Sequence, residues 1–352
     1  MTPKQVRQSL FALVVILVLT IGGMLRSGTI ENPATGGETM GTGYSVKITG
    51  KVKQKTLRHI YEQIEARLTE INRQMSTWDP ESEISRFNHY RSLDAFQCSE
   101  EFAQVVRRAL ELSEESGGAF DPTLQPLLNL WGFGSEADAR NVPDDEAIRI
   151  VKETTGADKL RIDDSARLRK TEPEISLALG AIAKGYGVDA VGRILSEAGL
   201  ENWFVEIGGE VLAQGVNPDG VPWRIGIQFP TTNPLSEKLQ GIVHVNGGAI
   251  ATSGNYRNYI KENGMVYSHI LDPRTGRAVK SNTASVTVSA SSCMDADGLA
   301  TALFVMGPDE GIAWVETLEN VETMFLIRDE NGKIVERFSS GFRQATGYSS
   351  EL

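Results

Sequence analysis

Apolar residues recur every three or four positions between Gln54 and Met75, which is the spacing of an amphipathic helix. A second helix is predicted to begin after Ser99, a favoured N-cap residue, with Glu100 in its first turn. The glycine pair that starts at Gly117 predicts the end of this helix. The first half of the chain therefore contains at least two helices.

Strand-like runs dominate the second half of the chain. An alternating run at Tyr44, Val46 and Ile48 predicts one earlier strand. The further predicted strands are Ile175–Leu179, Trp203–Ile207, Arg224–Phe229, Ile242–Val245, Ala284–Ala290 and Met324–Ile327. The helices predicted between them are Ala183–Ala198 and Met294–Met306. Strands interleaved with helices in this way predict a mixed α+β fold.

Residues 1–26 have the layout of an export signal or a membrane anchor. Lys4 and Arg7 precede an apolar run from Leu10 to Leu25, and Arg26 follows it. A buried core helix is the alternative, but the terminal position and the flanking charges favour export. No small-x-small cleavage site follows the run, so one uncleaved anchor helix is expected. The basic N-terminus predicts that the rest of the chain lies on the periplasmic side of a bacterial inner membrane.

The rest of the chain divides by composition. Residues 27–39 are rich in Gly, Thr, Asn and Pro and are expected to form a flexible tether. Residues 40–328 carry the periodic segments and are expected to form the folded body. Residues 329–352 are polar and are expected to form a partly disordered tail.

Charge and cysteine content narrow the class of protein. A formal charge of -11 excludes a general nucleic-acid-binding surface, because such surfaces are basic. An anionic ligand would instead need locally placed cations. Only two cysteines, Cys98 and Cys293, are present, which excludes a disulfide framework and a multi-thiolate metal site. The sequence leaves open whether these two cysteines form a disulfide.

Acidic and hydroxyl side chains gather at the start of the predicted helix Met294–Met306. Asp297 and Thr301 are four residues apart, so one helical turn places them side by side. A carboxylate and a hydroxyl are hard oxygen ligands of the kind that Mg²⁺ prefers. Acidic residues such as Asp295 at a helix start are more often caps, and the spacing alone does not decide between the two roles.

A turn punctuated by glycines, from Gly180 to Gly187, joins a predicted strand to a predicted helix. Backbone amides at such a turn, together with Lys184, are suited to bind a pyrophosphate. The string matches neither a Walker motif nor a dinucleotide fingerprint. A plain strand-to-helix connection with a surface lysine is the alternative.

His269 is one of four histidines and lies near the end of a predicted strand. A neutral imidazole there is suited to act as a general base toward a hydroxyl, with Asp272 or Asp297 to orient it. A purely structural histidine is the alternative. The glycine-rich strings 117–122 and 206–210 are also candidate ligand contacts, although hairpins would explain them equally well.

Eight strings together make the chain resemble the FAD:protein FMN transferases, also called ApbE-like flavin transferases. The strings, in order between about residues 40 and 327, are Glu-Thr-Met-Gly-Thr, Met-Ser-Thr-Trp-Asp-Pro, Gly-Gly-Ala-Phe-Asp-Pro-Thr, Gly-Ala-Ile-Ala-Lys-Gly-Tyr, Glu-Ile-Gly-Gly-Glu, Thr-Ser-Gly-Asn-Tyr, Ser-His-Ile-Leu-Asp-Pro-Arg-Thr-Gly and Asp-Gly-Leu-Ala-Thr-Ala. No single string suffices, but eight in register are specific to the family.

The resemblance implies an α+β body of two lobes, with FAD in the cleft between them, and a role for each matching residue. The residues expected to contact FAD are Met40, Trp78, Ala119, Phe120, Asp121, Lys184 and Ile270. The groups expected to hold Mg²⁺ are Asp297, Thr301 and the carbonyl of Ala181, and His269 is the expected base. Ala178 stands where the family usually has Asp, which is expected to weaken or retune FAD binding unless Glu174 or Ser176 compensates.

The resemblance implies that the protein splits FAD, attaches the FMN half through a phosphoester to a Thr or Ser of an acceptor protein, and releases AMP. A membrane electron-transport subunit with a short Ser/Thr motif is the expected acceptor. An FAD pyrophosphatase that releases FMN and AMP, and a non-catalytic FAD-binding carrier, are the alternatives. A redox enzyme is disfavoured because the chain has no nicotinamide fingerprint and no redox cysteine pair.

Overall fold

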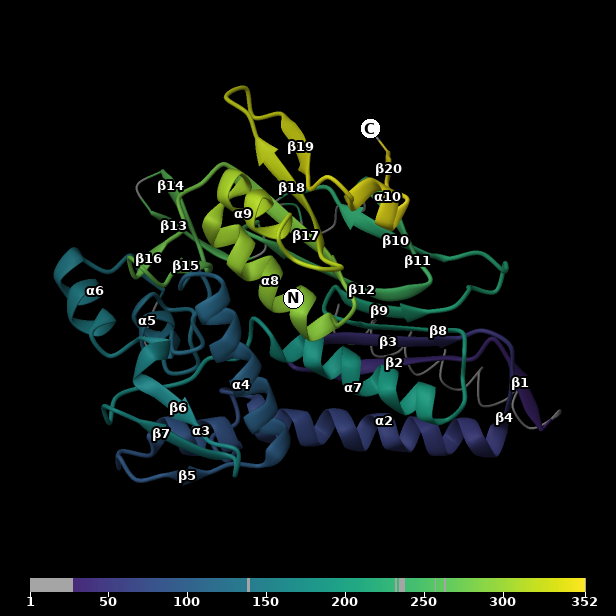
Figure 1. The fold of residues 1–352 in the computed structure, drawn as a ribbon, viewed down its shortest axis with the longest axis horizontal. Helices are drawn as coiled ribbons and strands as arrows, with labels where there is room; N and C mark the ends of the chain where they lie inside the picture. The colour runs from purple at the N-terminus through teal and green to yellow at the C-terminus, as the bar shows by residue number, and fades with distance from the viewer. Residues whose placement is uncertain are drawn as a thin grey trace, which may run out of the picture.

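An eight-stranded antiparallel sheet forms the centre of the computed structural model (Figure 1). The structure describes residues 28–351 except 138–139, 232, 234–237, 257 and 263. The strands of this sheet are β2 (Ala34–Thr39), β3 (Thr42–Ile48), β8 (Trp203–Ile207), β9 (Glu210–Gln214), β12 (Gly247–Gly254), β17 (Thr283–Ala290), β18 (Glu322–Arg328) and β19 (Ile334–Phe338). Their spatial order is β19-β18-β17-β12-β9-β8-β3-β2.

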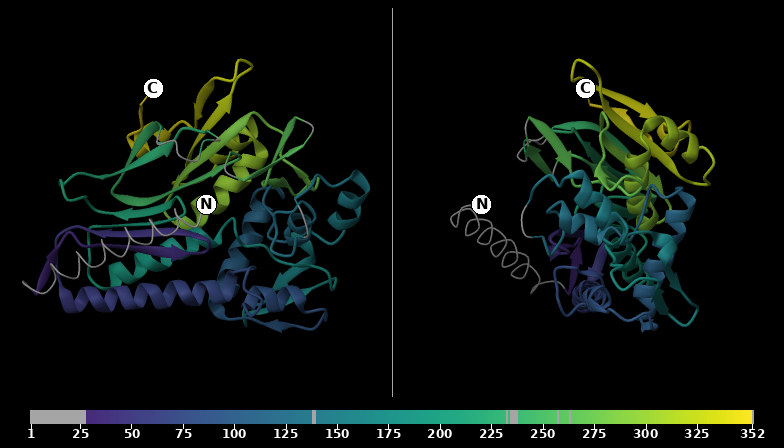
Figure 2. Two further views of the ribbon diagram at one scale, coloured as in Figure 1. Left: turned by 180° about the vertical axis from the view of Figure 1, so that it is seen from behind. Right: turned by 90° about the vertical axis from the view of Figure 1, so that its left-hand side faces the viewer.

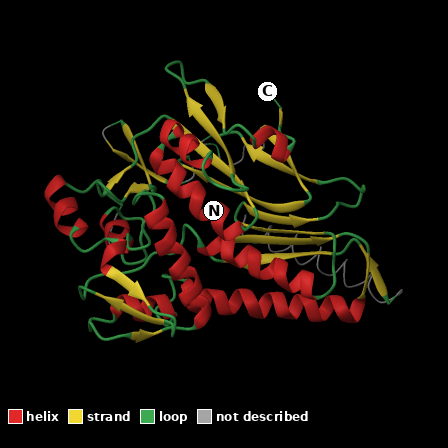
Figure 3. Ribbon diagram, in the orientation of Figure 1, coloured by secondary structure: helices red, strands yellow, loops and turns green. Residues whose placement is uncertain are grey.

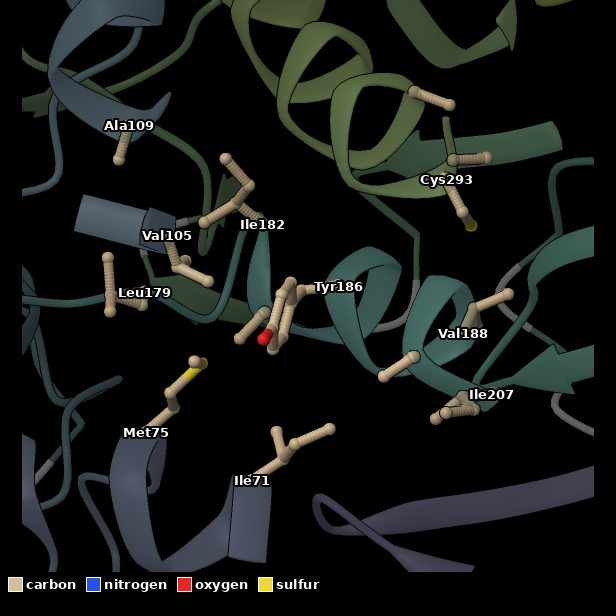
Figure 4. Close-up of a cluster of buried hydrophobic side chains, with 14 of the residues drawn as sticks. Ile71, Met75, Val105, Ala109, Leu179, Ile182, Tyr186, Val188, Ile207 and Cys293 are labelled. Carbon is tan, nitrogen blue, oxygen red and sulfur yellow. The ribbon is translucent and has the colours of Figure 1, made fainter. Parts of the chain in front are cut away.

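Helices cover one face of this sheet (Figure 3). They are α2 (Gln54–Met75), α7 (Ala183–Glu197), α8 (Cys293–Met306) and α9 (Pro308–Val315). Figure 4 shows Tyr186 of α7 directed toward Ile71 and Met75 of α2, inside the largest apolar cluster. The Tyr186 hydroxyl accepts a hydrogen bond from the Arg67 guanidinium at 2.8 Å. The buried ring therefore keeps its polar atom paired, as burial requires.

A smaller sheet and a short helix cover the other face. They are β10 (Trp223–Gln228), β11 (Leu239–Val245), β20 (Ser349–Ser350) and α10 (Phe342–Thr346). Ile250 of β12 and Met324 of β18 join Phe342 in the apolar cluster between the two sheets. Because both faces are covered, β17 is buried at nearly every position instead of alternating between buried and exposed.

The segment between α2 and α7 builds a smaller part of the molecule at one end of the sheet (Figures 1 and 2). Its elements are α3 (Glu83–His89), β5 (Phe96–Gln97), α4 (Glu100–Glu115), α5 (Gln125–Leu130), α6 (Asp145–Lys152), a 3-10 helix (Ala157–Lys159), β6 (Leu160–Ile162) and β7 (Arg167–Lys170). Two hairpins, β13 (Tyr259–Glu262) with β14 (Met265–Ser268) and β15 (Leu271–Asp272) with β16 (Arg277–Ala278), pack against α5 and α6. The predicted mixed α+β fold is confirmed.

The predicted helices agree with the structure, but one predicted strand does not. The helix over Gln54–Met75 is α2, and α4 begins after Ser99, whose hydroxyl accepts a hydrogen bond from the Phe102 amide. The strand prediction for 175–179 is wrong, because the segment pairs with no other strand. Its central residue Leu177 instead exchanges two hydrogen bonds, at 2.7 and 2.9 Å, with the side-chain amide of Asn88.

The expected flexible tether and disordered tail are both wrong for the residues that the structure describes. Within 27–39, β1 (Thr29–Glu31) pairs with β4 (Lys51–Lys53), and β2 pairs with β3. An edge strand needs only its backbone partners, so a polar, glycine-rich segment can fill it. Within 329–352, β19 pairs with β18, and Phe342 is fully buried under the sheet.

The anchor predicted over residues 1–26 lies outside the described residues. Among the helices within 28–351, apart from the gaps given above, none combines the length and the hydropathy that a membrane span requires. Cys98 and Cys293 are both buried and free, so the question of their pairing is answered: they do not form a disulfide.

Candidate active site

A cavity of about 480 Å³ lies where the smaller part of the molecule meets the sheet. Such a volume falls in the range of small-molecule and cofactor sites. Ten predicted site residues line it: Ala119, Phe120, Asp121, Ala178, Ala181, Lys184, His269, Ile270, Asp297 and Thr301. They come from a loop after α4, the turn before α7, α8 and the segment after β14, so the fold gathers side chains from four distant parts of the chain.

The turn before α7 places Lys184 in a cluster with two carboxylates. The Lys184 ammonium donates to Asp297 at 3.1 Å and lies 3.3 Å from Glu210. Asp297 also accepts a hydrogen bond from the Gly185 amide at 3.0 Å, at the first turn of α7. An acidic group there is stabilised by the amino end of the helix. The cluster therefore joins α7, α8 and β9 at one point of the cavity wall.

Charge and burial act in opposite directions within this cluster. Burial alone would lower the pKa of Lys184, but the carboxylates of Asp297 and Glu210 raise it above its ordinary value. Burial raises the pKa of Glu210, and the Lys184 ammonium opposes that shift. Lys184 is thus a permanent cation, available to an anionic ligand at neutral pH.

The imidazole of His269 is fixed by the backbone. Its Nδ1 lies 3.1 Å from the carbonyl oxygen of Asn258, which can only accept a hydrogen bond. The proton therefore resides on Nδ1, and Nε2 carries the lone pair. Burial is the main cause that lowers the pKa of His269, and the charges of Lys184 and Arg140 act in the same direction. Neutral His269 is available as a proton acceptor.

The prediction that Asp272 or Asp297 orients His269 is wrong. Asp272 pairs instead with Arg274, at 3.0 Å, and Asp297 pairs with Lys184. The Asn258 carbonyl takes the orienting role, and a backbone carbonyl has no signature in sequence.

Oxygen atoms that suit a hard cation lie beside the cluster. Asp297 is 3% exposed, and the Thr301 hydroxyl, one turn further along α8, lies 3.1 Å from the hydroxyl of Ser253. Ala181 lines the same cavity. In the described part of the chain, no group of three or more His, Cys, Asp or Glu side chains is able to hold a metal. Asp295 faces elsewhere, since it pairs with Arg108 at 2.6 Å.

A sequence model of the ApbE family matches residues 40–325 of the chain. The chain belongs to the ApbE family. The FAD:protein FMN transferase of Vibrio cholerae is 42% identical over 333 residues, which are 93% of this chain and 97% of that protein. The FAD:protein FMN transferase of Haemophilus influenzae is 39% identical over 88% of this chain and 90% of that protein.

Solved structures of the ApbE family agree with this membership. The flavin transferase ApbE from Vibrio cholerae superposes with a TM-score of 0.81 at 42% identity, over 89% of this chain and 99% of that chain. The apo form of the Pseudomonas stutzeri flavinyl transferase ApbE gives a TM-score of 0.81 at 37% identity, over 91% and 98% of the two chains. This ApbE-family protein is therefore an enzyme of the transferase class.

Two residues that the ApbE resemblance assigned to FAD do not line the cavity. Trp78 lies in the turn after α2 and is 72% exposed. Met40 has a positive φ of 50° in the β2–β3 turn, and its side chain packs in the helical layer near Gly187. The structure thus separates both side chains from the ten residues that it brings together.

Glu210, the last residue of the candidate string 206–210, is a residue of this ApbE-family site for which no individual role was predicted. It is 4% exposed and lines the cavity, and its second carboxylate oxygen, Oε2, is buried without a hydrogen-bond partner among the described residues. An acidic residue directly after a double glycine, Gly208-Gly209, is the sequence signal that could have indicated it.

The departure at Ala178 is visible in the cavity wall. Ala178 lines the cavity, and its amide donates to the Pro122 carbonyl at 2.7 Å. Neither Glu174 nor Ser176 is among the lining residues, and the Ser176 hydroxyl donates to the Glu174 carbonyl at 3.1 Å. In this ApbE-family protein, neither side chain replaces the missing carboxylate.

Proposed function

We propose that this protein is a magnesium-dependent FAD:protein FMN transferase. It would cleave the pyrophosphate of FAD and attach FMN through a phosphoester to a Thr or Ser hydroxyl of an acceptor protein. One observation supports this function best: a neutral imidazole and a cluster of Lys184, Asp297 and Glu210 line the same cavity. The imidazole suits a proton transfer, and the cluster suits a pyrophosphate.

The cavity offers separate surfaces to the two halves of such a substrate. Phe120, Ile227 and Ile270 contribute an apolar wall for a flat ring system. Lys184 lies in the first turn of α7, where backbone amides add a positive field for phosphate oxygens. The pyrophosphate would therefore lie against the start of α7.

The donor atoms at this point fit Mg²⁺. Glu210 and Asp297 place two carboxylates beside a single Lys184, so an anionic substrate needs a further cation there. Asp297, Thr301 and the Ala181 carbonyl would hold that ion, since all three offer oxygen atoms. When bound, Mg²⁺ would neutralise pyrophosphate charge and stabilise the negative charge that develops on its oxygens.

The residues of the chain then account for the transfer step. Nε2 of His269 takes the proton of the acceptor hydroxyl, and the hydroxyl oxygen attacks the FMN-side phosphorus. A new bond forms between that phosphorus and the acceptor oxygen, and the bond from phosphorus to the bridging oxygen breaks. The bridging oxygen leaves on AMP with its negative charge, near the Lys184 ammonium.

Mass spectrometry tests the proposal. The protein is incubated with FAD, Mg²⁺ and a candidate acceptor domain; the acceptor is weighed intact and AMP is assayed. We expect the acceptor to gain the mass of an FMN unit, and expect Asp297→Ala or a chelator to abolish the gain. Asp295→Ala is the matched control, because it removes the same charge from the same helix outside the cavity.

Other outcomes identify the alternatives. AMP and free FMN without a modified acceptor would establish the pyrophosphatase. Intact FAD retained by the protein after incubation with Mg²⁺ would establish a carrier.

We also propose where the protein works. Residues 1–26 would anchor it in the bacterial inner membrane with the body on the periplasmic side, and the acceptor would be a membrane electron-transport subunit in that compartment. Cell fractionation with the N-terminus intact, followed by protease treatment of spheroplasts, tests both points. A full-length protein that is recovered in the soluble fraction, or that is protected in spheroplasts, would contradict this placement.

A further inference from the structure

A second cavity, of about 840 Å³, shares a wall with the first. Tyr256 lines both cavities. Residues of three chain segments, 228–229, 254–259 and 268–269, form the shared wall. These segments contain four pairs of consecutive residues in which one residue lines the first cavity and its neighbour lines the second. The first member of each pair lines the catalytic cavity and the second lines the other one in Gln228-Phe229, Gly254-Asn255 and Asn258-Tyr259. The order is reversed in Ser268-His269.

The second cavity is cationic in an acidic protein. Lys261, Lys280 and Arg328 line it, and none of its lining residues is Asp or Glu. The formal charge of the whole chain is -11. In the described part of the chain, none of these three cations is ion-paired with a carboxylate. A ligand with negative charge would therefore gain attraction here without displacing a carboxylate partner.

A hairpin with unpaired edges forms one side of this cavity. β13 and β14 pair only with each other among the described residues, and the hairpin stands at the surface beside β15 and β16 (Figure 1). Met265 and Val266 of β14 are 50% and 58% exposed. A free strand edge with exposed apolar side chains can accept an extended peptide as an added strand.

The same strand leads to the catalytic base. β14 ends at Ser268, and His269 is the next residue. A chain that runs along β14 would therefore arrive beside the imidazole. We propose that the second cavity and the edge of β14 bind an extended, acidic segment of the acceptor protein and deliver its Ser or Thr hydroxyl to His269. This inference rests on the proposed transfer function, and it concerns the way in which the acceptor is recognised.

A peptide explains these features better than a second nucleotide does. A nucleotide would use the cations and the rings of Tyr259 and Tyr267, but it would leave the strand edge and the exposed Met265 and Val266 without a role. The position of His269 directly after β14 also suits a ligand that carries a hydroxyl along that strand.

Binding without turnover provides the test. Two fluorescent peptides of equal length carry the same central Thr, flanked by Asp in one and by Asn in the other. Each is titrated into the full-length protein without FAD, so that no transfer occurs, and anisotropy is recorded. We expect the acidic peptide to bind more tightly, and the double variant Lys261→Glu/Lys280→Glu to weaken its binding about tenfold or more. Added salt should reduce the preference.

Lys51→Glu/Lys53→Glu is the matched control, because it makes the same charge change on β4, whose residues line neither cavity. Equal binding of the two peptides, or equal loss in both double variants, overturns the proposal. AMP that binds with the same sensitivity to Lys261→Glu/Lys280→Glu, while the peptide does not bind, would overturn it in favour of a nucleotide site.

A parallel transfer assay separates this inference from the proposed function. FMN transfer whose KM for the acceptor is unchanged by Lys261→Glu/Lys280→Glu would retain the function and reject the docking site. Charge-sensitive peptide binding without FMN transfer would retain the docking site and reject the function.

Discussion

The basicity of His269 depends on one backbone carbonyl. The Asn258 oxygen holds the proton on Nδ1, at 3.1 Å, and leaves Nε2 free for the reaction. A neutral partner orients the ring without placing a further buried negative charge beside an anionic substrate. A carboxylate in that position would raise the basicity of the ring, but it would repel the pyrophosphate.

His269→Ala should retain FAD binding and lower FMN transfer by about 10²-fold or more, because it removes the proton acceptor. Flavin fluorescence measures binding, and intact mass of the acceptor measures transfer. His244→Ala is the control, since the His244 ring also meets a backbone carbonyl, that of Gly347 at 3.2 Å, and lies outside both cavities. Unchanged transfer by His269→Ala would remove this residue from the mechanism.

The pH dependence of transfer should report the lowered pKa of His269. Burial and nearby cations lower that pKa below its ordinary value of 6.5. A base works only when unprotonated, so the rate should stay constant as pH falls to 6.5 and decline only below the lowered pKa. The limiting decline is about tenfold per pH unit. A profile of kcat/KM that already declines above pH 6.5 would contradict the assignment.

At the residue scale, motif strings located most of the site. Nine of the ten predicted residues that line the cavity belong to strings that the family resemblance recognises as units, and Ala178 lies two positions before one of these strings. Met40 and Trp78 belong to such strings but lie elsewhere. The Asn258 carbonyl was beyond prediction, because a backbone group is present in every residue and only the folded chain selects one.

Among the elements, α7 and α8 fix the cluster by their close approach. A methyl group added at Gly185 would lie 2.2 Å from the Cys293 carbonyl oxygen. Only glycine permits this contact, which brings the Gly185 amide to Asp297 at 3.0 Å. The distance between these two helices therefore decides whether Lys184 and Asp297 remain together.

Gly185→Ala should destabilise the protein by about 1–3 kcal/mol, because the added methyl meets rigid backbone. The helix propensity of Ala would offset only about 1 kcal/mol of a larger clash. Urea unfolding measures the change in the free energy of unfolding. Gly180→Ala is the control, since nothing lies within 4 Å of its added methyl. Equal stability of the two variants would show that the helices can separate without cost.

The elements that sequence predicts well are those with regular apolar spacing, such as α2. β12 escaped prediction because most of its residues from Gly247 to Gly254 are Gly, Ala or Ser, which are small and have low strand propensity. Their burial in the middle of the sheet, with Ala249 and Ala251 under the helical layer, explains why small residues are needed. Residues 175–179 were predicted as a strand but are not one. Their apolar run resembles a buried strand, but the segment has no strand to pair with, and sequence does not reveal whether a partner is present.

For the whole molecule, the C-terminal segment is part of the fold. Phe342 is fully buried between the two sheets, so Phe342→Ala should lower the free energy of unfolding by about 3–5 kcal/mol. Val335→Ala, at a position that is 43% exposed, should change it by less than about 0.5 kcal/mol. Urea unfolding followed by circular dichroism compares them. Equal effects would mean that the segment detaches from the body.

The total charge describes the molecule poorly. An overall value of -11 excludes a basic surface, yet Lys261, Lys280 and Arg328 line one cavity without an acidic neighbour in its wall. The net charge of the sequence does not reveal this local cluster of positive charge, because the three cations come from different strands and loops. The fold alone brings them together.

The two free cysteines can report local opening of the protein through their reaction with a thiol reagent. Cys98 lies in the smaller part of the molecule and Cys293 lies at the contact of α7 and α8, and both are buried. Burial raises the pKa of Cys98 to about 12 and that of Cys293 well above its ordinary value, so neither thiol reacts while it is enclosed. The labelling rate of each sulfur then measures how often its own region opens. Faster labelling at Cys293 than at Cys98 would reveal breathing between the two helices that hold the cluster, without any engineered dye site.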